Sequence, residues 1–475
     1  MGKLFEAFAG KGVYLLHIMP GENDAILRDY QKHYRCRWPA AGDPDYAIVS
    51  RYQARAWPTG VIVDRGGRIR FQQKIPSREV ATIERLLTDL SRGESPSGHE
   101  SGGLTYPGKK TPDETDFRPP SPALTIDSNG NPCVAFVRGT AEGSDLVLRR
   151  FKAGKFSREI VIVSGRDDKL DPAIAAGEDG KLWVAWVSNV VRRYDIYASE
   201  VGAASAAMRE RVTASPDDAF HPRMVIDKDG ALWVTYYEWR RHDGVSRDRE
   251  VFVRCRANGA WQDARQVSPS DVPWYEDHTD PAIAMDAIGR KWIFWSWDYH
   301  PPKAGGRYRA RSPSIFCRWV EKEIMGEVEA VGEQDRSIDM WPTAARDAGG
   351  TLWCVWDRAG GKYPAGMKRQ PAVSVLRGEG FSTVTPIPCD VSLSGSPMIA
   401  AWGRGKACVV WCAPSGRRRH VFRSTYDGKG WTPPRTVALE HDPWFPVIAA
   451  DAEGTVWMAY SARTKDGWDV FLRKL

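Results

Sequence analysis

The chain from residue 119 to its C-terminus repeats one pattern of proline, apolar and aromatic positions. Seven prolines begin the repeat. A glycine follows each of them eight residues later, and an aromatic residue follows fourteen residues later. Both offsets are kept in every copy, which predicts seven similar strand–turn–strand units. The prolines are Pro122, Pro172, Pro222, Pro281, Pro342, Pro397 and Pro446; the glycines are Gly130, Gly180, Gly230, Gly289, Gly350, Gly405 and Gly454; the aromatic residues are Phe136, Trp186, Tyr236, Trp295, Trp356, Trp411 and Tyr460.

Each part of this repeat has a structural interpretation. The run after the proline is short and made of small apolar residues, as expected of an inner strand near a crowded axis. An Asp three residues before the glycine can cap a turn, and glycine accepts the positive φ that such a turn needs. The Leu-Trp-Val-x-Trp pattern that follows alternates as a strand whose rings pack between units. The turn Asp residues are Asp127, Asp227, Asp286, Asp347 and Asp451.

The spacing of the repeats predicts a mainly β protein with a seven-bladed β-propeller over residues 119–475. Successive prolines are 49 to 61 residues apart, which is the length of one four-stranded blade. Six blades with one aberrant repeat are the alternative. Only three strands fit between Pro446 and the C-terminus, so we expect residues 103–107 to supply the fourth and close the ring.

Residues 1–92 mix strand-like and helix-like patterns, and residues 93–118 are rich in Ser, Gly, Pro and Lys, as is typical of a linker. The predicted domains are therefore 1–92, a linker over 93–118 and the propeller over 119–475. The elements that we expect in the first domain are a strand over 12–19, helices over 23–34, 46–52 and 78–90, and a hairpin with a Gly-Gly turn over 61–71.

This N-terminal order, with the segments Phe8 to Ile18, Trp57-Pro58-Thr59 and Asp64 to Ile69, resembles the redoxin and TlpA-like branch of the thioredoxin superfamily. The resemblance implies a truncated α/β thioredoxin-like domain in which Pro58 is the family's cis-proline. The family's Cys-x-x-Cys pair would lie upstream of Met1. We expect either a start codon assigned too late or a redox-inactive remnant, and in both cases no dithiol chemistry in the chain as written.

Composition and charge narrow the classes of function. A net charge of +7, from 67 basic and 60 acidic residues spread along the chain, is too dilute for a nucleic-acid footprint. No run of about 18 apolar residues predicts a membrane span, and no signal-peptide pattern opens the chain. The eight Cys residues show no metal-binding spacing. We therefore expect neither nucleic acid nor membrane as a partner, and a cytoplasmic protein as written, or a periplasmic or extracellular one if the true start lies upstream.

Three consecutive repeats place an acid or a histidine directly before the proline: Asp171, His221 and Asp280. All three should therefore lie near the propeller axis. Paired carboxylates with a histidine could act as general acid and base. No cofactor is implied, although the same groups could bind a divalent cation. The structural alternative is that Asp before Pro caps a turn and His221 is a satisfied polar group.

Loops on the same predicted face carry further acids together with aromatic residues, which suit stacking on sugar rings. The Asp-x-x-Gly-x-x-Trp turn loosely resembles the sialidase and BNR-type repeat class, although three arginines of a sialidase site cannot be assigned here. The candidate ligand-binding residues are Glu238, Trp239, Arg240, Tyr275, Glu276, His278, Asp298, Asp339, Trp341 and Asp357.

Three functions fit these patterns. The first is a binding module that recognises a glycan or a protein on the propeller face and is tethered to a redox-inactive thioredoxin-like domain. The second is a carbohydrate-active hydrolase or lyase that uses the acids and the histidine. The third is a thiol-disulfide oxidoreductase, which requires a Cys-x-x-Cys segment upstream of Met1.

Overall fold

A computed structural model describes most of the chain beyond residue 120 and a few segments before it. Two compact units are present, one of Met1–Glu114 with Arg241–Arg247 and one of Thr115–Arg240 with Asp248–Leu475. The described residues are 16–20, 39–43, 59–63, 69–74, 87 and 121–475, without 141–142, 191–192, 243–245, 271–275, 299–312, 333–334, 336, 361–367, 379, 390–394, 416–417, 438, 440 and 465–466.

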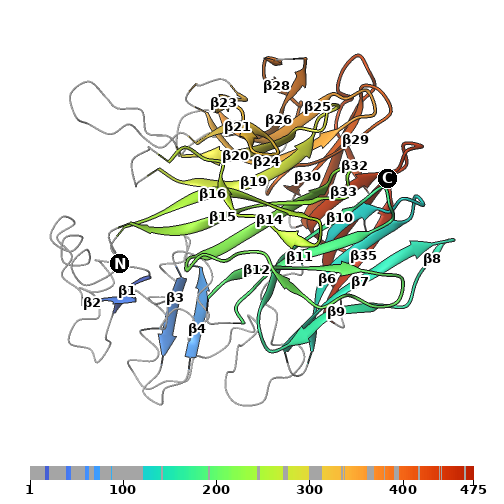
Figure 1. The fold of residues 1–475 in the computed structure, drawn as a ribbon. Coiled ribbons are helices and arrows are strands. Elements are labelled where there is room, and N and C mark those ends of the chain that lie inside the picture. Colours follow the sequence, from blue (N-terminus) through green and yellow to red (C-terminus); the bar gives the residue numbers. More distant parts are fainter. Residues whose placement is uncertain are drawn as a thin grey trace, which may run out of the picture. The chain divides into compact units, whose positions relative to one another are not determined.

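The larger unit consists of seven antiparallel sheets, which follow one another along the chain (Figure 1). Blade 1 contains β5 (Ala123–Ile126), β6 (Pro132–Thr140), β7 (Gly143–Lys152), β8 (Lys155–Phe156) and β9 (Ile160–Gly165), and blade 2 contains β10 (Lys169–Ala176), β11 (Leu182–Ser188), β12 (Asp195–Val201) and β13 (Glu210–Arg211). Blade 3 contains β14 (Asp218–Ile226), β15 (Leu232–His242), β16 (Ser246–Ala257), β17 (Ala260–Trp261) and β18 (Arg265–Gln266). Blade 4 contains β19 (His278–Met285), β20 (Lys291–Trp297), β21 (Ser314–Glu321), β22 (Ile324–Met325) and β23 (Glu329–Ala330). Blade 5 contains β24 (Ile338–Arg346), β25 (Leu352–Gly360), β26 (Lys368–Arg377), β27 (Gly380–Phe381) and β28 (Thr385–Pro386). Blade 6 contains β29 (Met398–Trp402), β30 (Lys406–Ser415), β31 (Arg418–Tyr426) and β32 (Arg435–Val437). Blade 7 contains β33 (Pro443–Ala450), β34 (Val456–Thr464) and β35 (Gly467–Lys474).

The sheets form a closed ring. The first strand of each blade contacts the first strand of the next, and β33 of the last blade contacts β5 of the first. Phe151 of β7 and Trp457 of β34 also pack across this junction, with ring centroids 5.3 Å apart. The seven-bladed propeller is thereby confirmed, and the six-bladed alternative is wrong. Blade 7 has three described strands, and the residues expected to complete it, 103–107, lie outside the described part of the chain.

The seven repeat glycines form the turn between the first and second strand of each blade. All seven have a positive φ, from 66° at Gly405 to 98° at Gly289, as the sequence predicts. The turns lie side by side in successive blades, because Gly230 lies beside Asp179 and Gly350 beside Ala287. We call this end of the ring the turn face, and the opposite end, where the first strands begin at the seven prolines, the proline face.

The turn Asp caps the backbone and also binds a tryptophan. Asp227 Oδ1 accepts hydrogen bonds from the backbone N–H groups of Asp229 and Ala231, at 3.1 and 2.9 Å. Its second oxygen accepts the indole N–H of Trp233 at 2.9 Å. Trp292 and Trp353 bind Asp286 and Asp347 in the same way, at 3.0 and 3.1 Å. The carboxylate therefore ties the turn to the second strand, a link that explains why tryptophan recurs six residues after the Asp.

The second aromatic position of the repeat fills the space between blades, as expected. Trp186, Trp295, Trp356, Trp411 and Tyr236 are fully buried. They pack against small residues of the inner strands, such as Ala173 and Ala175 in blade 2. This alternation of large rings and small inner residues allows seven sheets to converge on one axis.

Free cysteines are part of this interior. Cys133, Cys255, Cys317, Cys354, Cys389, Cys408 and Cys412 are all buried, and none forms a disulfide within the described residues. Burial raises the pKa of the Cys133 thiol to about 12 and that of Cys408 to about 11. The Cys133 and Cys408 thiols are therefore protonated at neutral pH and behave as small apolar side chains.

The smaller unit is described only in short segments. Strand β1 (His17–Pro20) pairs in parallel with β2 (Ala40–Asp43), and β3 (Thr59–Val63) pairs antiparallel with β4 (Ile69–Lys74). The second pair confirms the expected hairpin, whereas β2 was not expected. Pro58 and the three expected helices lie outside the described residues except for Leu87, and these four strands do not by themselves define a thioredoxin-like fold. No helix in the described residues is long and apolar enough to cross a membrane.

Candidate functional site

Three side chains meet on the proline face of blades 2 to 4. His221 Nε2 lies 3.7 Å from Asp171 Oδ2, and His221 Nδ1 lies 3.4 Å from Asp280 Oδ1. The imidazole is thus placed between two carboxylates that come from the two neighbouring blades. All three side chains keep access to solvent, with 26 % of Asp171, 35 % of His221 and 16 % of Asp280 exposed. The structure brings together the three residues that the sequence singles out as acid–base candidates.

The local backbone presents these side chains in an unusual way. Asp171, His221 and Asp280 have φ values of 47°, 54° and 54°, a left-handed conformation that costs non-glycine residues energy. Each lies in a β-bulge, where one extra residue interrupts the pairing of the first and second strands. The following proline has no N–H group to donate, so it fits the unpaired position. The bulge changes the direction of the side chain relative to the strand. Three such bulges in neighbouring blades bring Asp171, His221 and Asp280 together.

Asp280 is oriented by a second contact. The Thr279 hydroxyl donates a hydrogen bond of 2.9 Å to Asp280 Oδ2, whereas Oδ1 is the oxygen that faces His221. The two oxygens of Asp280 therefore have different partners. This division fixes the plane of the carboxylate relative to the imidazole.

Two further residues belong to this cluster and were not identified from the sequence. The ring of Tyr237 lies 5.5 Å from that of His221. Burial raises the pKa of the Tyr237 phenol, with Arg249 opposing this effect and Asp280 and Asp171 adding to it. Arg223 follows the proline, and removal from water lowers the pKa of its guanidinium, although Asp171 and Asp280 act in the opposite direction. A signal for Arg223 exists in the sequence, because the residue after the proline is uncharged in the other six repeats.

The cluster can transfer protons. Each ring nitrogen of His221 lies within 4 Å of a carboxylate, which is an arrangement suited to general acid–base chemistry. Burial keeps the phenol of Tyr237 protonated at neutral pH. Among the described residues, no group of three or more His, Cys, Asp or Glu side chains is arranged to hold a metal ion.

The candidate ligand residues of blade 3 lie mainly below this surface. Glu238 is buried, and its Oε2 lies 3.2 Å from Arg240 Nε. Arg240 also lies 3.7 Å from Asp217 and covers the ring of Phe252. Trp239 is covered by the guanidinium of Arg249 at 4.9 Å. These side chains are therefore engaged in contacts within blade 3.

Blade 4 contributes a buried layer next to Asp280. Glu276 accepts the indole N–H of Trp297 at 2.8 Å, and His278 Nδ1 accepts that of Trp295 at 3.0 Å. Burial lowers the pKa of His278 to about 3, so the ring is neutral. The backbone N–H of Asp298 donates to the carbonyl of Asp277 at 2.8 Å. Tyr275 lies outside the described residues.

Blade 5 contains two buried acids with arginine partners. Asp339 lies 3.1 Å from Arg358, and Asp357 pairs with Arg369. Burial raises the pKa of Asp339 to about 6, although Arg358 opposes the shift. Trp341, which precedes the proline of this blade, has its ring 4.7 Å from the Arg369 guanidinium. Of these candidates, Trp341 shares the pre-proline position of His221.

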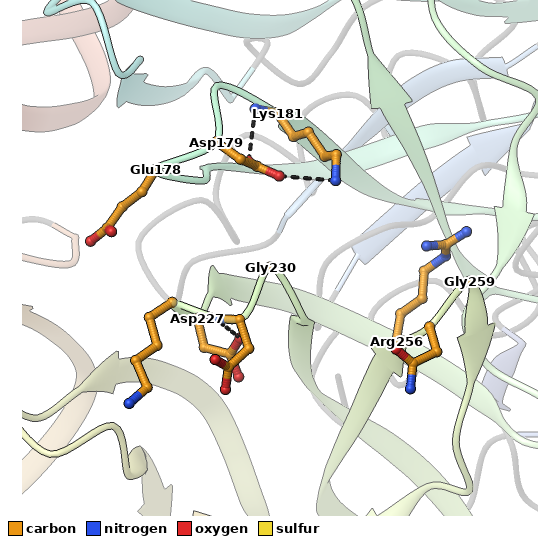
Figure 2. A pocket seen from close by; sticks show the side chains of 10 residues that line it. Glu178, Asp179, Lys181, Asp227, Gly230, Arg256 and Gly259 are labelled. Carbon is orange, nitrogen blue, oxygen red and sulfur yellow. Dashed lines mark hydrogen bonds and ion pairs between the residues drawn. The ribbon is translucent and has the colours of Figure 1, made fainter.

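A separate cavity of about 320 Å³ lies on the turn face between blades 2 and 3 (Figure 2). Side chains of both charges line it. Asp179 is paired with Lys181 at 2.9 Å, Asp227 with Lys291 at 3.0 Å, and Arg256 with Glu210 at 2.7 Å. About six strand residues separate Asp227 from His221, which is roughly 15 to 20 Å. The cavity is therefore remote from the acid–histidine cluster, and Asp179, Asp227 and Arg256 of its lining each have an ion-pair partner.

Comparison with solved structures finds proteins of similar fold, two of which act on carbohydrates. An ulvan lyase, a polysaccharide lyase bound to a GlcA(1-4)Rha3S fragment, matches with a TM-score of 0.52 and 9 % identity over 76 % of this chain and 95 % of its own. An α-L-arabinanase of Penicillium chrysogenum, complexed with arabinobiose, matches with a TM-score of 0.46 and 14 % identity over 66 % and 95 %. No family model and no curated protein matches the chain. At these identities the likeness shows the fold alone.

Proposed function

We propose that the propeller is a carbohydrate-active enzyme, a hydrolase or a lyase, whose active site is the cluster around His221. The observation that carries the proposal is the imidazole of His221 between Asp171 and Asp280, at 3.7 and 3.4 Å. A structural role alone does not require three neighbouring blades to adopt a left-handed backbone at the same point. Strained backbone of this kind persists where it serves a site.

The residues have distinct roles in this proposal. His221 moves the proton, and Asp171 and Asp280 orient its ring and stabilise the imidazolium. In hydrolysis, His221 takes a proton from the water that attacks the anomeric carbon, the bond from that carbon to the glycosidic oxygen breaks, and the Tyr237 phenol gives a proton to that oxygen. In elimination, His221 takes the proton next to a uronate carboxylate, the bond from the neighbouring carbon to the glycosidic oxygen breaks, and the Tyr237 phenol protonates that oxygen. The fold likeness to an ulvan lyase supports a polysaccharide as the substrate.

A product assay separates the two reactions. The full chain is incubated with ulvan, polygalacturonate and linear arabinan, and both reducing ends and the ultraviolet absorbance of unsaturated uronates are followed. Reducing ends with the absorbance identify a lyase, and reducing ends without it identify a hydrolase. Binding to a polymer without release of reducing ends would contradict the proposal and support a glycan-binding module instead.

Variants then assign the activity to the cluster. His221→Ala should lower kcat roughly 10²- to 10⁴-fold, because it removes the proton-transfer group. His420→Ala, in strand β31 of blade 6, is the matched control and should leave kcat unchanged. Equal activity of wild type and His221→Ala, both folded by circular dichroism, would place the reaction elsewhere.

A further inference from the structure

The bulge that presents the acid–histidine cluster occurs in two more blades with aromatic residues. Trp341 in blade 5 and Phe445 in blade 7 also precede the repeat proline, with φ values of 59° and 48°. The same one-residue interruption of pairing is present in both blades. In ring order, the pre-proline positions of blades 2 to 5 and 7 therefore carry two acids, one histidine and two aromatic rings.

The left-handed backbone is a costly place for these rings. It costs about 1–2 kcal/mol for a non-glycine residue, and a bulky side chain there is an outlier. Glycine would remove this cost, and the same chain uses glycine at all seven turns of the opposite face. The strain at Trp341 and Phe445 thus has the same form as the strain at His221, which the proposed function assigns to the active site.

Both rings are placed for contact from outside the protein. Phe445 is 47 % exposed, and it is the only aromatic residue among the exposed large hydrophobic side chains of the described residues. Trp341 is half-buried, with Arg369 stacked against its ring at 4.7 Å. Its backbone N–H donates to Ser296 Oγ at 3.0 Å. Ser296 pairs with Thr279, the neighbour of Asp280, so Trp341 is fixed beside the cluster.

We infer that Trp341 and Phe445 are two stacking subsites for the sugar rings of a polysaccharide that lies across the proline face. The inference rests on the proposed function and deepens it by naming the residues that hold the polymer. An aromatic face covers the C–H face of a pyranose, and the neighbouring carboxylates accept hydrogen bonds from its hydroxyl groups. Trp341 is adjacent to Asp280, and Phe445 lies beyond blade 6. A short fragment at the cluster therefore reaches Trp341 first, whereas Phe445 requires a longer chain.

Affinity electrophoresis of the full chain through native gels that contain ulvan or linear arabinan tests this directly. Wild type should be retarded by at least one polymer. Phe445→Leu and Trp341→Leu, which keep an apolar side chain but lose the flat ring, should weaken binding roughly 2- to 12-fold, the range of an aromatic contact. Phe445→Tyr keeps a flat ring and should be retarded like wild type. Ile288→Ala, an exposed apolar residue of the turn face that is 68 % exposed, is the matched control and should bind like wild type.

The outcomes separate this inference from the proposed function. His221→Ala should be retarded like wild type, because it loses proton transfer and keeps both rings. A wild type that binds through Phe445 but releases no reducing ends contradicts the enzyme and leaves the stacking subsites standing. The inference is overturned if Phe445→Leu and Trp341→Leu bind like wild type, or if neither polymer retards the wild type.

Discussion

Each inner strand has a positive φ at one or both of its ends, and the residues that adopt it differ between the two faces of the ring. On the turn face the residue is always glycine, and in five of the seven blades an Asp three residues earlier accepts its backbone N–H. On the proline face it is Asp171, His221, Asp280, Trp341 or Phe445. The turn face thus takes the residue of lowest cost, whereas the proline face keeps a side chain despite the cost. This contrast in backbone cost is the reason for proposing a site on the proline face.

The pKa values of two buried carboxyl groups also differ between the turn face and the proline face. At Asp227 on the turn face, desolvation alone would raise the pKa, but hydrogen bonds from Lys291 and Trp233 lower it overall. In the half of β16 nearest the proline face, desolvation raises the pKa of Glu250 to about 8, although Ser268 opposes the shift. Asp227 is therefore stabilised in its charged form by its partners, whereas Glu250 is stabilised in its protonated form by burial.

The largest expected effect tests the stability of the turn face. Asp347→Ala removes acceptors for the backbone N–H groups of Gly349, Thr351 and Gly405 and for the Trp353 indole. Because the indole N–H would be left buried without a partner, we expect a loss of about 3 kcal/mol in the free energy of unfolding by urea denaturation. Asp179→Ala, at an exposed turn Asp in blade 2, should lose less than about 1 kcal/mol. Equal losses would remove the distinction between buried and exposed caps.

A second pair of substitutions separates backbone strain from crowding. Gly350 has a φ of 87°, and a β-carbon on it would lie 2.8 Å from Ala287 Cβ. Gly130 has a φ of 77°, and a β-carbon there would meet no described atom within 4 Å. Gly130→Ala should cost about 1 kcal/mol through strain alone, and Gly350→Ala about 2 kcal/mol or more. Thermal unfolding of both variants measures the difference, and a Gly130→Ala variant that is no less stable than wild type would contradict the strain argument.

The third prediction concerns pH. The raised pKa of Glu250 means that the native state holds this proton more tightly than the unfolded chain, so its contribution to stability falls as pH rises towards 8. Buried His278, 4.0 Å away, has a pKa lowered to about 3, so its opposite effect is confined to pH below about 6.5. Between pH 6.5 and 8, wild type should lose up to about 1.4 kcal/mol per pH unit through Glu250.

Chemical denaturation across this pH window measures the slope. Glu250→Gln should flatten it, because the proton no longer leaves. Asp286→Asn is the control from the turn face: desolvation of Asp286 is outweighed by hydrogen bonds from Trp292 and Arg290, which lower its pKa. This variant should therefore lose the same free energy of unfolding at every pH in the window and keep the wild-type dependence of stability on pH. An unchanged slope in Glu250→Gln would mean that the carboxylate is already ionised at neutral pH.

The smallest expected effect is a gain. Phe445→Gly removes the strain of a left-handed aromatic residue that is half exposed, and we expect the free energy of unfolding to rise by about 1 kcal/mol. Phe445→Ala keeps a β-carbon and should not show this gain. A loss of stability in Phe445→Gly, measured by urea denaturation, would show that the ring contributes to packing and would weaken its assignment as a sugar subsite.

The propeller can be predicted from the sequence because the same short-range pattern of residues recurs in every blade. Proline, turn Asp, glycine and the core tryptophans each act within a few residues, so their offsets can be counted. The Asp-to-indole hydrogen bond and the bulge before the proline are also periodic, but their geometry cannot be derived from residue types alone. Tyr237 approaches His221 from the neighbouring strand β15, which no spacing in the chain expresses, whereas Arg223 is marked in the sequence as the one charged residue directly after a repeat proline.

The candidate ligand residues show the limit of a prediction based on polar loops. Glu238, Glu276 and Asp357 are polar and near the proline face, yet they are buried in contacts with Arg240, Trp297 and Arg369. Sequence alone does not distinguish an acid that meets a ligand from one that supports a loop. In the first domain the elements are not repeated, so nothing along the chain reinforces each expectation.

The contact of β33 with β5 joins segments that are more than 300 residues apart in the chain. Every other junction between neighbouring blades is made by consecutive repeats and can form as soon as both have been synthesised. The last junction must wait until the seventh repeat has left the ribosome, and until then two blade surfaces stay uncovered. Biogenesis of this protein therefore has a late, vulnerable step, during which chaperones or self-association compete with closure of the circle.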